Sequence, residues 1–396
     1  MSLSAVRGPA DHMRRIRTMR HHSAFLLTAI LLWSCIASGA KSDEPVATTA
    51  PAEAASRGET AVKVSVFYLT NRKRYQGKPV ADTYSGERGE AHFGRCEVEF
   101  TPIPIINQVA SRMPFYLKSE TNLVSLAEQA DSALFWEQLG AALERTSSGS
   151  VVLFVHGYNY GFERTCRMAA EMQRSLQDKA TVLVFSWPSN ALPTDYVRDQ
   201  ADIEWSVPVL ANLIRQLGNR IGKANVQVVA HSLGSRGVIL ALQRLAFERI
   251  ERPAIGPLVL LAPDFDSQTF VDLLPGLASL TGGITLYTSD NDTPLKLSHQ
   301  LSGYPRLGEA GEYLTLVAGM DTIDVSSIGR YQITGHEYFY FHPLVTADLV
   351  ALLSTGARAA QRSGLEAKKR DGIRYWGFTG AVDNDGPASN VDDGRH

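Results

Sequence analysis

Short apolar runs alternate with stretches of helical apolar spacing from residue 150 onward. The runs have the apolar composition of buried strands, and the stretches between them repeat apolar residues at three- and four-residue intervals. The predicted strands are SVVLFVHG (150–157), ATVLVFSWPS (180–189), VQVVAHS (226–232), PLVLLAP (257–263) and ITLYTSDND (284–292). The predicted helices lie at 162–178, 199–221, 233–247, 269–280, 294–301 and 343–354. This alternation predicts an α/β fold with a mostly parallel central sheet that helices cover on both faces, and it places a functional site at the carboxyl ends of the strands.

The two flanks of the alternating region are less regular. VKVSVFYLTNR (62–72) and RCEVEF (95–100) are predicted strands, and NLVSLAEQADSALFWEQLGAALER (122–145) has the apolar period of a helix. The polar, Gly- and Asp-rich segment 356–396 is predicted to be a disordered tail, although IRYWGF (373–378) could dock on the fold. The predicted folded domain is therefore 61–355.

The first 40 residues have the three parts of a secretory signal. Arg14, Arg15, Arg17 and Arg20 precede the apolar stretch AFLLTAILLWSCIA (24–37), and the small residues SGA (38–40) follow it. The apolar stretch is short for a membrane span, although an uncleaved anchor would share the pattern. We therefore expect export to the periplasm or out of the cell, with residues 41–60 as a flexible linker.

The chain has three cysteines, and each leaves a choice open. Cys35 follows LLWS, which resembles a bacterial lipobox, so lipidation and membrane attachment are an alternative to cleavage after Ala40; Trp33 is bulky where a lipobox usually has a small residue. Cys96 and Cys166 could pair in an oxidising compartment, or both could remain free thiols.

Composition and charge exclude several classes of protein. The chain has 396 residues, is 44% hydrophobic and 20% charged, and carries a formal net charge of −2, which is typical of a globular protein. With no basic block, nucleic acid is not an expected partner. The histidines and cysteines show no metal-ligand spacing and no phosphate loop is present, so no cofactor is predicted.

A candidate nucleophile lies where a predicted strand gives way to a helix. VVAHSLGSRGV (228–238) places Ser232 in the motif A-x-S-x-G, which differs from the nucleophile motif G-x-S-x-G only by Ala230. Small flanking residues let the strand turn sharply into the helix and expose the serine. The motif alone is weak, and its strand–turn–helix context strengthens it.

A serine nucleophile needs a base, and two histidines near the end of the domain are candidates. His336 follows Gly335 in a predicted loop after the last strands, whereas His342 precedes Pro343 at the start of a helix. The order nucleophile, acid, histidine favours His336, and a structural role suits His342.

The acid that orients the histidine should lie between Ser232 and His336 in the sequence. Four aspartates follow predicted strands in that interval: Asp264, Asp266, Asp290 and Asp292. The strand nearest the histidine loop favours the pair Asp290 and Asp292, and the residues alone leave the choice within the pair open. The alternative role for each is to cap a helix.

Two backbone amides are predicted to form an oxyanion hole. One is the amide of Leu233, directly after the nucleophile, and the other is that of Tyr158, where Gly157 lets the chain turn after its strand. His156, His231 and His299 are predicted to be structural. Trp187 is a candidate wall of the substrate pocket, with a core tryptophan as the equal alternative.

Several segments together resemble the α/β-hydrolase fold, and more narrowly a bacterial family of α/β hydrolases of unknown function that is loosely described as esterase- or lipase-like. The segments are FYLTNR, VLFVHGYN, SWPS, AHSLGS, LLAPDFD, SDND with LSHQLSGYPRLG, and GHEYF, within about residues 62–355. The resemblance implies Ser232 as nucleophile, Asp292 as acid and His336 as base, and it selects Asp292 over Asp290.

These observations predict an enzyme that hydrolyses small-molecule carboxylic esters with a Ser-His-Asp triad. No long insertion follows LLAPDFD, so we expect no large cap domain, an open site and short acyl chains. An acyltransferase or a thioesterase would show the same triad, and a binding protein that keeps the fold without catalysis is the alternative from another class. The sequence does not determine the oligomeric state.

Overall fold

A computed structural model describes residues 60–102, 119–192, 194–248, 254–329 and 335–379. The described residues within 60–191 and 197–379 form one compact unit. The predicted signal segment, the cleavage site, Cys35 and nearly all of the linker lie outside the described residues. None of the helices within the described ranges is both long enough and apolar enough to span a membrane.

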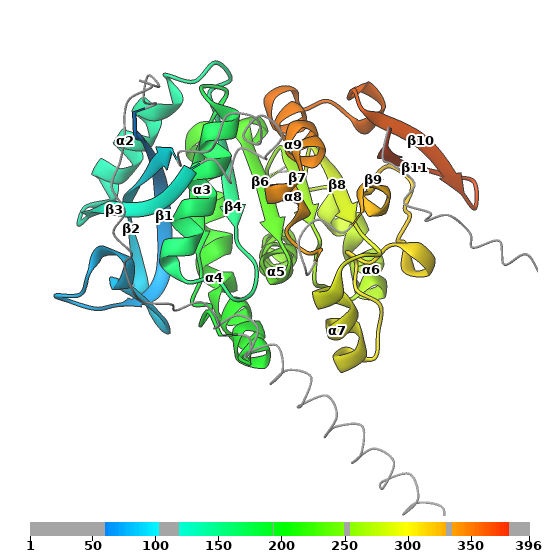
Figure 1. Cartoon of the computed structure of the whole chain (residues 1–396), viewed down its shortest axis with the longest axis horizontal. Helices are drawn as coiled ribbons and strands as arrows, with labels where there is room; N and C mark the ends of the chain where they lie inside the picture. Colours follow the sequence, from blue (N-terminus) through cyan, green and yellow to red (C-terminus); the bar gives the residue numbers. More distant parts are fainter. Residues whose placement is uncertain (1–59, 103–118, 193, 249–253, 330–334, 380–396) are drawn as a thin grey trace, which may run out of the picture. The chain divides into compact units, whose positions relative to one another are not determined.

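Eleven strands of the described chain form one sheet in the order β10-β11-β9-β8-β7-β6-β4-β5-β1-β2-β3. All neighbours from β1 across to β11 are parallel, and antiparallel pairs extend the sheet at both ends, which confirms a mostly parallel α/β fold (Figure 1). The strands are β1 (Val62–Arg74), β2 (Tyr84–Pro102), β3 (Ser119–Gln129), β4 (Ser150–Val155), β5 (Ala180–Ser186), β6 (Val226–His231), β7 (Pro257–Leu261), β8 (Gly283–Thr288), β9 (Asp321–Asp324), β10 (Leu365–Arg370) and β11 (Ile373–Phe378).

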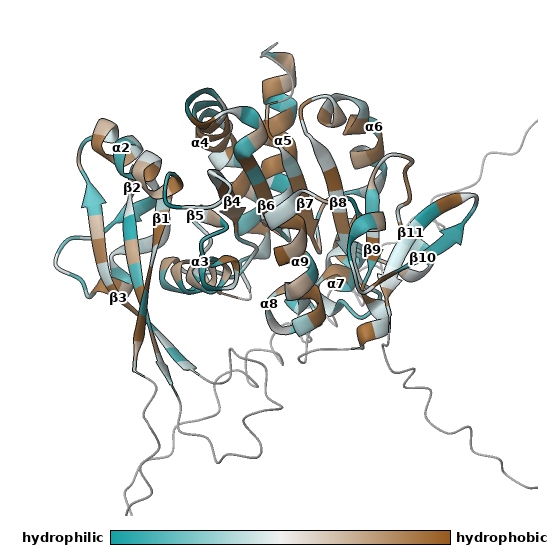
Figure 2. Ribbon diagram, turned by 90° about the horizontal axis from the view of Figure 1, so that it is seen from above, coloured by the Kyte–Doolittle hydropathy of each residue, from teal (hydrophilic) through white to brown (hydrophobic). Residues whose placement is uncertain are grey.

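Helices cover both faces of the central strands. In Figure 2, α4, α5 and α6 lie on one side of the sheet, and α3, α8 and α9 lie on the other. The helices are α2 (Ser132–Leu143), α3 (Phe162–Leu176), α4 (Tyr196–Ile221), α5 (Leu233–Phe247), α6 (Ser267–Ala278), α7 (Thr293–Ser302), α8 (Tyr338–Phe341) and α9 (Pro343–Thr355). Short 3-10 helices are η1 (Val80–Asp82), η4 (Lys223–Asn225), η5 (Gly311–Tyr313), η6 (Ser326–Ile328) and η7 (Ala359–Gln361). Because both faces are covered, all residues of β4, β5 and β6 are buried, which explains their continuous apolar runs.

The segment 122–145 is not one helix, as its apolar period predicted. Its first part belongs to β3, which pairs with β2 and sets Leu123 opposite Val98. The helix α2 begins only after Asp131, whose side chain accepts a hydrogen bond from the Ala133 amide at 2.8 Å. A run such as NLVSLAEQ fits both the apolar repeat of a helix and that of a strand, and pairing with a neighbouring strand decides which one forms.

The prediction of a disordered tail from residue 356 is wrong for residues 356–379. β10 and β11 form a hairpin, and β11 adds to β9 with Trp376 opposite Ile323, so IRYWGF does dock on the fold. The segment before the hairpin is held by a buried cation, since Arg362 lies 3.3 Å from Asp348. The predicted domain end at residue 355 is therefore too early, and residues 380–396 lie outside the described ranges.

Cys96 on β2 and Cys166 on α3 are both buried, and the structure holds them as free thiols. Burial and a hydrogen bond to Cys96 raise the pKa of Cys166 well above the usual thiol value. Burial therefore favours the protonated form of the Cys166 thiol, which lies beside Cys96 in the core.

Candidate active site

Ser232 lies at the sharp turn between β6 and α5. Its backbone has φ 52° and ψ −125°, a left-handed conformation that costs a non-glycine residue strain. The turn is fixed from both sides, because the Ser232 amide donates to the Leu261 carbonyl at 3.0 Å and the Ser232 carbonyl accepts from the Asp264 amide at 3.2 Å. A strained serine between a parallel strand and a helix is the geometry of a nucleophile elbow.

Gly234 allows the start of α5 to press against the end of β4. A Cβ added at Gly234 would lie 2.4 Å from the His156 carbonyl oxygen and 2.5 Å from that of Val155. Only glycine fits this contact, which explains the second small residue of the motif in physical terms.

Asp292 and His336 are hydrogen-bonded to each other. The Nδ1 atom of His336 lies 2.7 Å from Oδ2 of Asp292, whose side chain is fully buried. The other carboxylate oxygen, Oδ1, accepts from the Leu295 amide at 2.9 Å, so Asp292 also caps α7. The start of α7 therefore holds the carboxylate in place. The carboxylate in turn orients the imidazole through Nδ1, which leaves Nε2 as the ring nitrogen that could accept a proton.

Burial and charge act on the pKa values of this pair. Burial lowers the pKa of His336, but the Asp292 charge and hydrogen bond more than offset this, so the pKa of His336 is raised. Burial also raises the pKa of Asp292, and the contacts with His336 and Leu295 oppose that rise. Burial thus disfavours both charged forms, and the pairing with Asp292 favours protonation of His336.

The loop that carries His336 lies against His231, the residue before Ser232. The imidazole rings of His231 and His336 are 4.6 Å apart between centroids, and Nε2 of His231 lies 3.3 Å from the His336 carbonyl oxygen. Within the described residues, no hydrogen bond joins Ser232 to the His336 side chain. The structure therefore brings the candidate acid Asp292 and the candidate base His336 together, and it places His336 near the turn at Ser232 without a hydrogen bond to Ser232.

The rival residues have other roles. Asp264 accepts from the Ser298 hydroxyl at 2.7 Å and lies 3.2 Å from the Arg306 guanidinium. Asp266 caps α6, since it accepts from the Thr269 amide at 2.7 Å, and Asp290 is exposed. His342 caps α9 through the Leu344 amide at 3.2 Å, as a structural role requires. The expected capping role therefore holds for Asp266, while Asp264 forms a buried ion pair.

The loop 156–161 after β4 lies close to Ser232, as the predicted oxyanion hole would require. A Cβ added at Gly157 would lie 2.6 Å from Nδ1 of His231 and 2.9 Å from Cβ of Ser232. Tyr158 follows in this loop and is half-buried, and Leu233 is the first residue of α5, where helix amides have no partner within the helix. The assignment of the Tyr158 and Leu233 amides to an oxyanion hole stays a prediction.

Replacing Gly157 with alanine should damage both folding and activity. The added methyl group has no room between His231 and Ser232, so we expect destabilisation of about 1–3 kcal/mol, the usual cost of overpacking. Thermal unfolding and ester turnover measure the two effects. The change Gly276→Ala on α6, where an added Cβ meets nothing within 4 Å, is the control. Full activity in Gly157→Ala would contradict the close approach of this loop to Ser232.

A buried cation that the sequence analysis did not single out supports this loop. Arg72 at the end of β1 donates to the Tyr160 carbonyl at 2.6 Å and to the Ser189 carbonyl at 2.7 Å. Burial lowers the pKa of Arg72 to about 9, and the charge of Asp199 opposes that shift. Arg72 belongs to FYLTNR, but nothing local in the sequence shows that it reaches a loop almost ninety residues later.

Trp187 is a core residue and not an exposed pocket wall. Its side chain is fully buried and stacks on His156 with 4.9 Å between ring centroids, while its Nε1 donates to the His156 carbonyl at 2.8 Å. The Trp187–His156 stack packs beneath the start of the loop 156–161.

His156 and His231 are themselves buried, and burial lowers both pKa values well below the usual histidine value. No group of three or more potential metal ligands occurs in the part of the chain that the structure describes.

Residues 131–353 match the model of a family described as α/β hydrolases of unknown function (DUF900). The chain belongs to this family. The family assignment agrees with the mostly parallel sheet, with the helices on its two faces and with the elbow at Ser232.

Two further comparisons give distant similarities. An uncharacterized protein (alr1448) of Nostoc sp. is 35% identical over 81 residues, which are 20% of this chain and 21% of the relative, so the match spans about a fifth of that protein. Lipase B of Aspergillus fumigatus is 17% identical with a TM-score of 0.37 over 59% of this chain and 60% of that one. An esterase of Pyrobaculum calidifontis is 10% identical with a TM-score of 0.33 over 76% of this chain and 87% of that one.

Proposed function

We propose that this α/β hydrolase cleaves carboxylic esters through a covalent acyl-enzyme on Ser232. The observation that carries the proposal is the 2.7 Å hydrogen bond between His336 and buried Asp292, on a loop that packs against the strained turn at Ser232. A carboxylate, an imidazole and a serine in this chain order form the set of groups that acyl transfer uses.

In the proposed mechanism each group acts at defined steps. Ser232 Oγ attacks the acyl carbonyl while Nε2 of His336 takes its proton, and Asp292 holds the imidazole and stabilises the imidazolium that forms. The amides of Leu233 and Tyr158 bind the oxyanion, a contribution of about 10²–10³-fold per donor. His336 then protonates the leaving alcohol, and it activates water to release the acid from Ser232.

The substrates of this site would be small esters with short acyl chains. Only residues 262–266 separate β7 from α6, so the structure has no cap domain at this connection. Without a cap there to enclose a long acyl chain, small-molecule esters are the favoured substrates, although Ser232 itself is only 3% exposed.

Export to the periplasm or the medium remains our proposal for the location, with membrane attachment as the alternative if Cys35 is lipidated. It rests on the arginines and the apolar stretch at 24–37. Fractionation of cells that express the full chain tests it. Recovery of the protein in the cytoplasm with residues 1–40 still attached would contradict it.

Turnover of p-nitrophenyl esters of increasing chain length tests the proposed activity. We expect hydrolysis that is fastest for short acyl groups and falls about 10⁴-fold or more in Ser232→Ala. The change Ser354→Ala on α9 is the control for the same loss of a hydroxyl. A folded wild-type protein with no turnover, or equal turnover in Ser232→Ala, would contradict the proposal. Transfer of the acyl group to added alcohols or thiols would identify an acyltransferase or a thioesterase instead.

The pH dependence of turnover should follow His336. Because the base must be neutral to take the proton, kcat/KM should rise with pH through the pKa of His336. Asp292 raises that pKa above the ordinary histidine value of 6.5, so the midpoint of the rise should lie above 6.5. A pH profile between 5 and 9 measures it, and a midpoint below 6.5 would show that Asp292 does not act on the catalytic base.

A further inference from the structure

A carboxylate directly after the candidate base links the two loops of the site. Oε1 of Glu337 accepts a hydrogen bond from the hydroxyl of Tyr160 and another, at 2.5 Å, from the guanidinium of Arg164. Tyr160 belongs to the loop 156–161 after β4, and Arg164 lies in the first turn of α3. Glu337 thus connects the histidine loop to the loop that approaches Ser232.

We propose that Glu337, Tyr160 and Arg164 form a clamp that holds His336 in register with the loop 156–161, which makes Glu337 and Tyr160 positioning residues for the reaction. The inference rests on the proposed hydrolase function and deepens it. It explains residues of HGYNYGFERT and GHEYF that the triad and the oxyanion hole do not use.

Both ends of the clamp are anchored independently. The Tyr160 amide donates to the Ser189 hydroxyl at 3.1 Å and its carbonyl accepts from Arg72 at 2.6 Å, while its ring is buried. On the other side, the Glu337 carbonyl accepts from the Tyr340 amide at 3.0 Å, which ties it to α8. Because both residues are held by their own loops, the hydrogen bond between Tyr160 and Glu337 couples the position of the loop 156–161 to that of the His336 loop.

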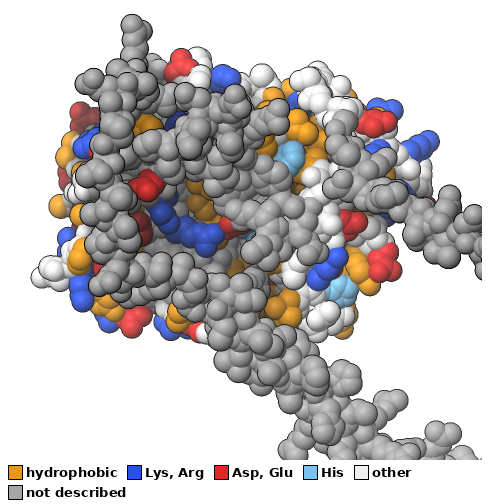
Figure 3. Space-filling model, viewed as in Figure 1, with side chains coloured by type: hydrophobic (Ala, Val, Ile, Leu, Met, Phe, Trp, Pro, Cys, Tyr) orange, Lys and Arg blue, Asp and Glu red, His pale blue; other side chains and the backbone are white. Residues whose placement is uncertain are grey.

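A charged donor strengthens the clamp at a largely buried carboxylate. The Glu337 side chain is 13% exposed and that of Arg164 is 39% exposed, and the guanidinium lies 4.2 Å from the centre of the Tyr160 ring. A carboxylate that accepts from two donors, one of them charged, forms stronger hydrogen bonds than a neutral pair, although the exposure of Arg164 lets solvent screen its charge. Figure 3 shows basic side chains near the centre of this face of the molecule, with acidic side chains close by.

The charge of Glu337 also acts on the base. After the opposing effects of burial and of Asp292, Glu337 is one of the groups that raise the pKa of His336. The other titratable groups that face His336 are His231 and Asp264. Loss of the Glu337 charge should therefore move the acid limb of the kcat/KM profile to lower pH, an effect that loss of packing alone would not produce.

The first arm of the test measures amide hydrogen exchange in the full-length wild type, Tyr160→Phe and Glu337→Gln. The clamp predicts that Tyr160→Phe speeds exchange at residues 335–338, and that Glu337→Gln speeds it at residues 157–161, each across the contact. Tyr313→Phe and Glu163→Gln, partly exposed residues, are the matched controls. Faster exchange only around the changed residue, or none at all, would overturn the clamp.

The second arm measures ester turnover in the same variants. We expect kcat to fall about 10- to 100-fold in Tyr160→Phe and Glu337→Gln with KM nearly unchanged, because a misplaced base costs rate rather than binding. Glu337→Gln should also shift the acid limb to lower pH, whereas Tyr160→Phe should not. Unchanged kcat in both variants would overturn the positioning role even if the exchange data support the contact.

The two proposals fail in different ways. If Ser232 of the wild-type protein does not react with a fluorophosphonate and the protein does not turn over esters, the proposed function is wrong. The catalytic role of the clamp is then wrong as well. Normal wild-type turnover with unchanged kcat and exchange in both clamp variants ends the clamp alone.

Discussion

Replacing Asp292 with asparagine should lower kcat about 10⁴-fold while the protein stays folded. An asparagine keeps the oxygen that accepts from the Leu295 amide, so the cap of α7 survives. Its amide group, however, offers a donor to Nδ1 of His336, which favours the wrong tautomer and removes the charge that stabilises the imidazolium. The measurement is steady-state ester turnover together with thermal unfolding.

Asp266→Asn is the matched control for this change. Asp266 caps α6 through the Thr269 amide in the same way as Asp292 caps α7, but it has no contact with His336. We expect wild-type turnover in Asp266→Asn. If Asp292→Asn kept more than a tenth of the wild-type kcat, Asp292 would not be the acid of the triad.

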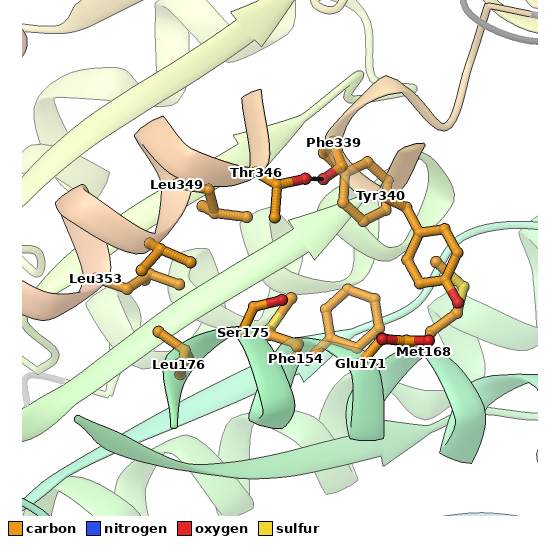
Figure 4. Close-up of a pocket in the computed structure, with 12 residues that line it drawn as sticks. Phe154, Met168, Glu171, Ser175, Leu176, Phe339, Tyr340, Thr346, Leu349 and Leu353 are labelled. Atoms are coloured by element: carbon orange, nitrogen blue, oxygen red, sulfur yellow. Dashed lines mark hydrogen bonds between the residues drawn. The ribbon is translucent and has the colours of Figure 1, made fainter. Parts of the chain in front are cut away.

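Replacing Glu171 with glutamine should stabilise the protein above neutral pH. Glu171 lies on α3 in an apolar pocket against α8 and α9, where Figure 4 shows it among Met168, Phe154 and Tyr340. Its side chain is buried, and neither carboxylate oxygen has a hydrogen-bond partner within the described structure. A buried charge without a partner is one of the costliest features of a protein core.

The sign of the effect follows from the pKa. Burial raises the pKa of Glu171 from 4.5 to about 7, with Arg174 opposing the shift. The folded state therefore binds the Glu171 proton more tightly than the unfolded state does. The contribution of this proton to the free energy of unfolding is fully present below pH 4.5 and is lost as pH rises through about 7. A shift of this size corresponds to about 3 kcal/mol between the two limits.

Urea unfolding at pH 5 and pH 8 measures this effect. Wild type should lose stability between the two values because of Glu171, and Glu171→Gln should lose about 2–3 kcal/mol less. Glu163→Gln, a more exposed position on the same helix, should unfold with the wild-type pH dependence. Equal pH dependence in Glu171→Gln and wild type would show that the carboxylate finds water or a partner.

The core of the fold could be predicted from the sequence, and Ser232 could be singled out as a candidate nucleophile, because both signals are local. The continuous apolar runs of the central strands mark a sheet buried on both faces, and the elbow needs small residues on each side of Ser232. The choice of Asp292 needed the family resemblance, because Asp290 occurs in the same strand end and only the folded chain shows which carboxylate reaches His336.

The features that sequence reasoning missed depend on contacts between distant segments. β10 reads as a polar tail, LEAKKR, because an edge strand of a hairpin buries little, and its pairing with β11 is not visible in its composition. The contacts of Arg72 and of Glu337 join residues 88 and 177 positions apart in the chain. Trp187 was ambiguous for the same reason, since burial against His156 depends on how two strand ends meet.

The most direct test of the account is the reaction of the full-length protein with a fluorophosphonate, followed by peptide mapping of the adduct by mass spectrometry. We expect one adduct, on Ser232, that is absent in Ser232→Ala and slow to form in Asp292→Asn. A folded protein that forms no adduct, or that carries the adduct on another residue, would contradict it.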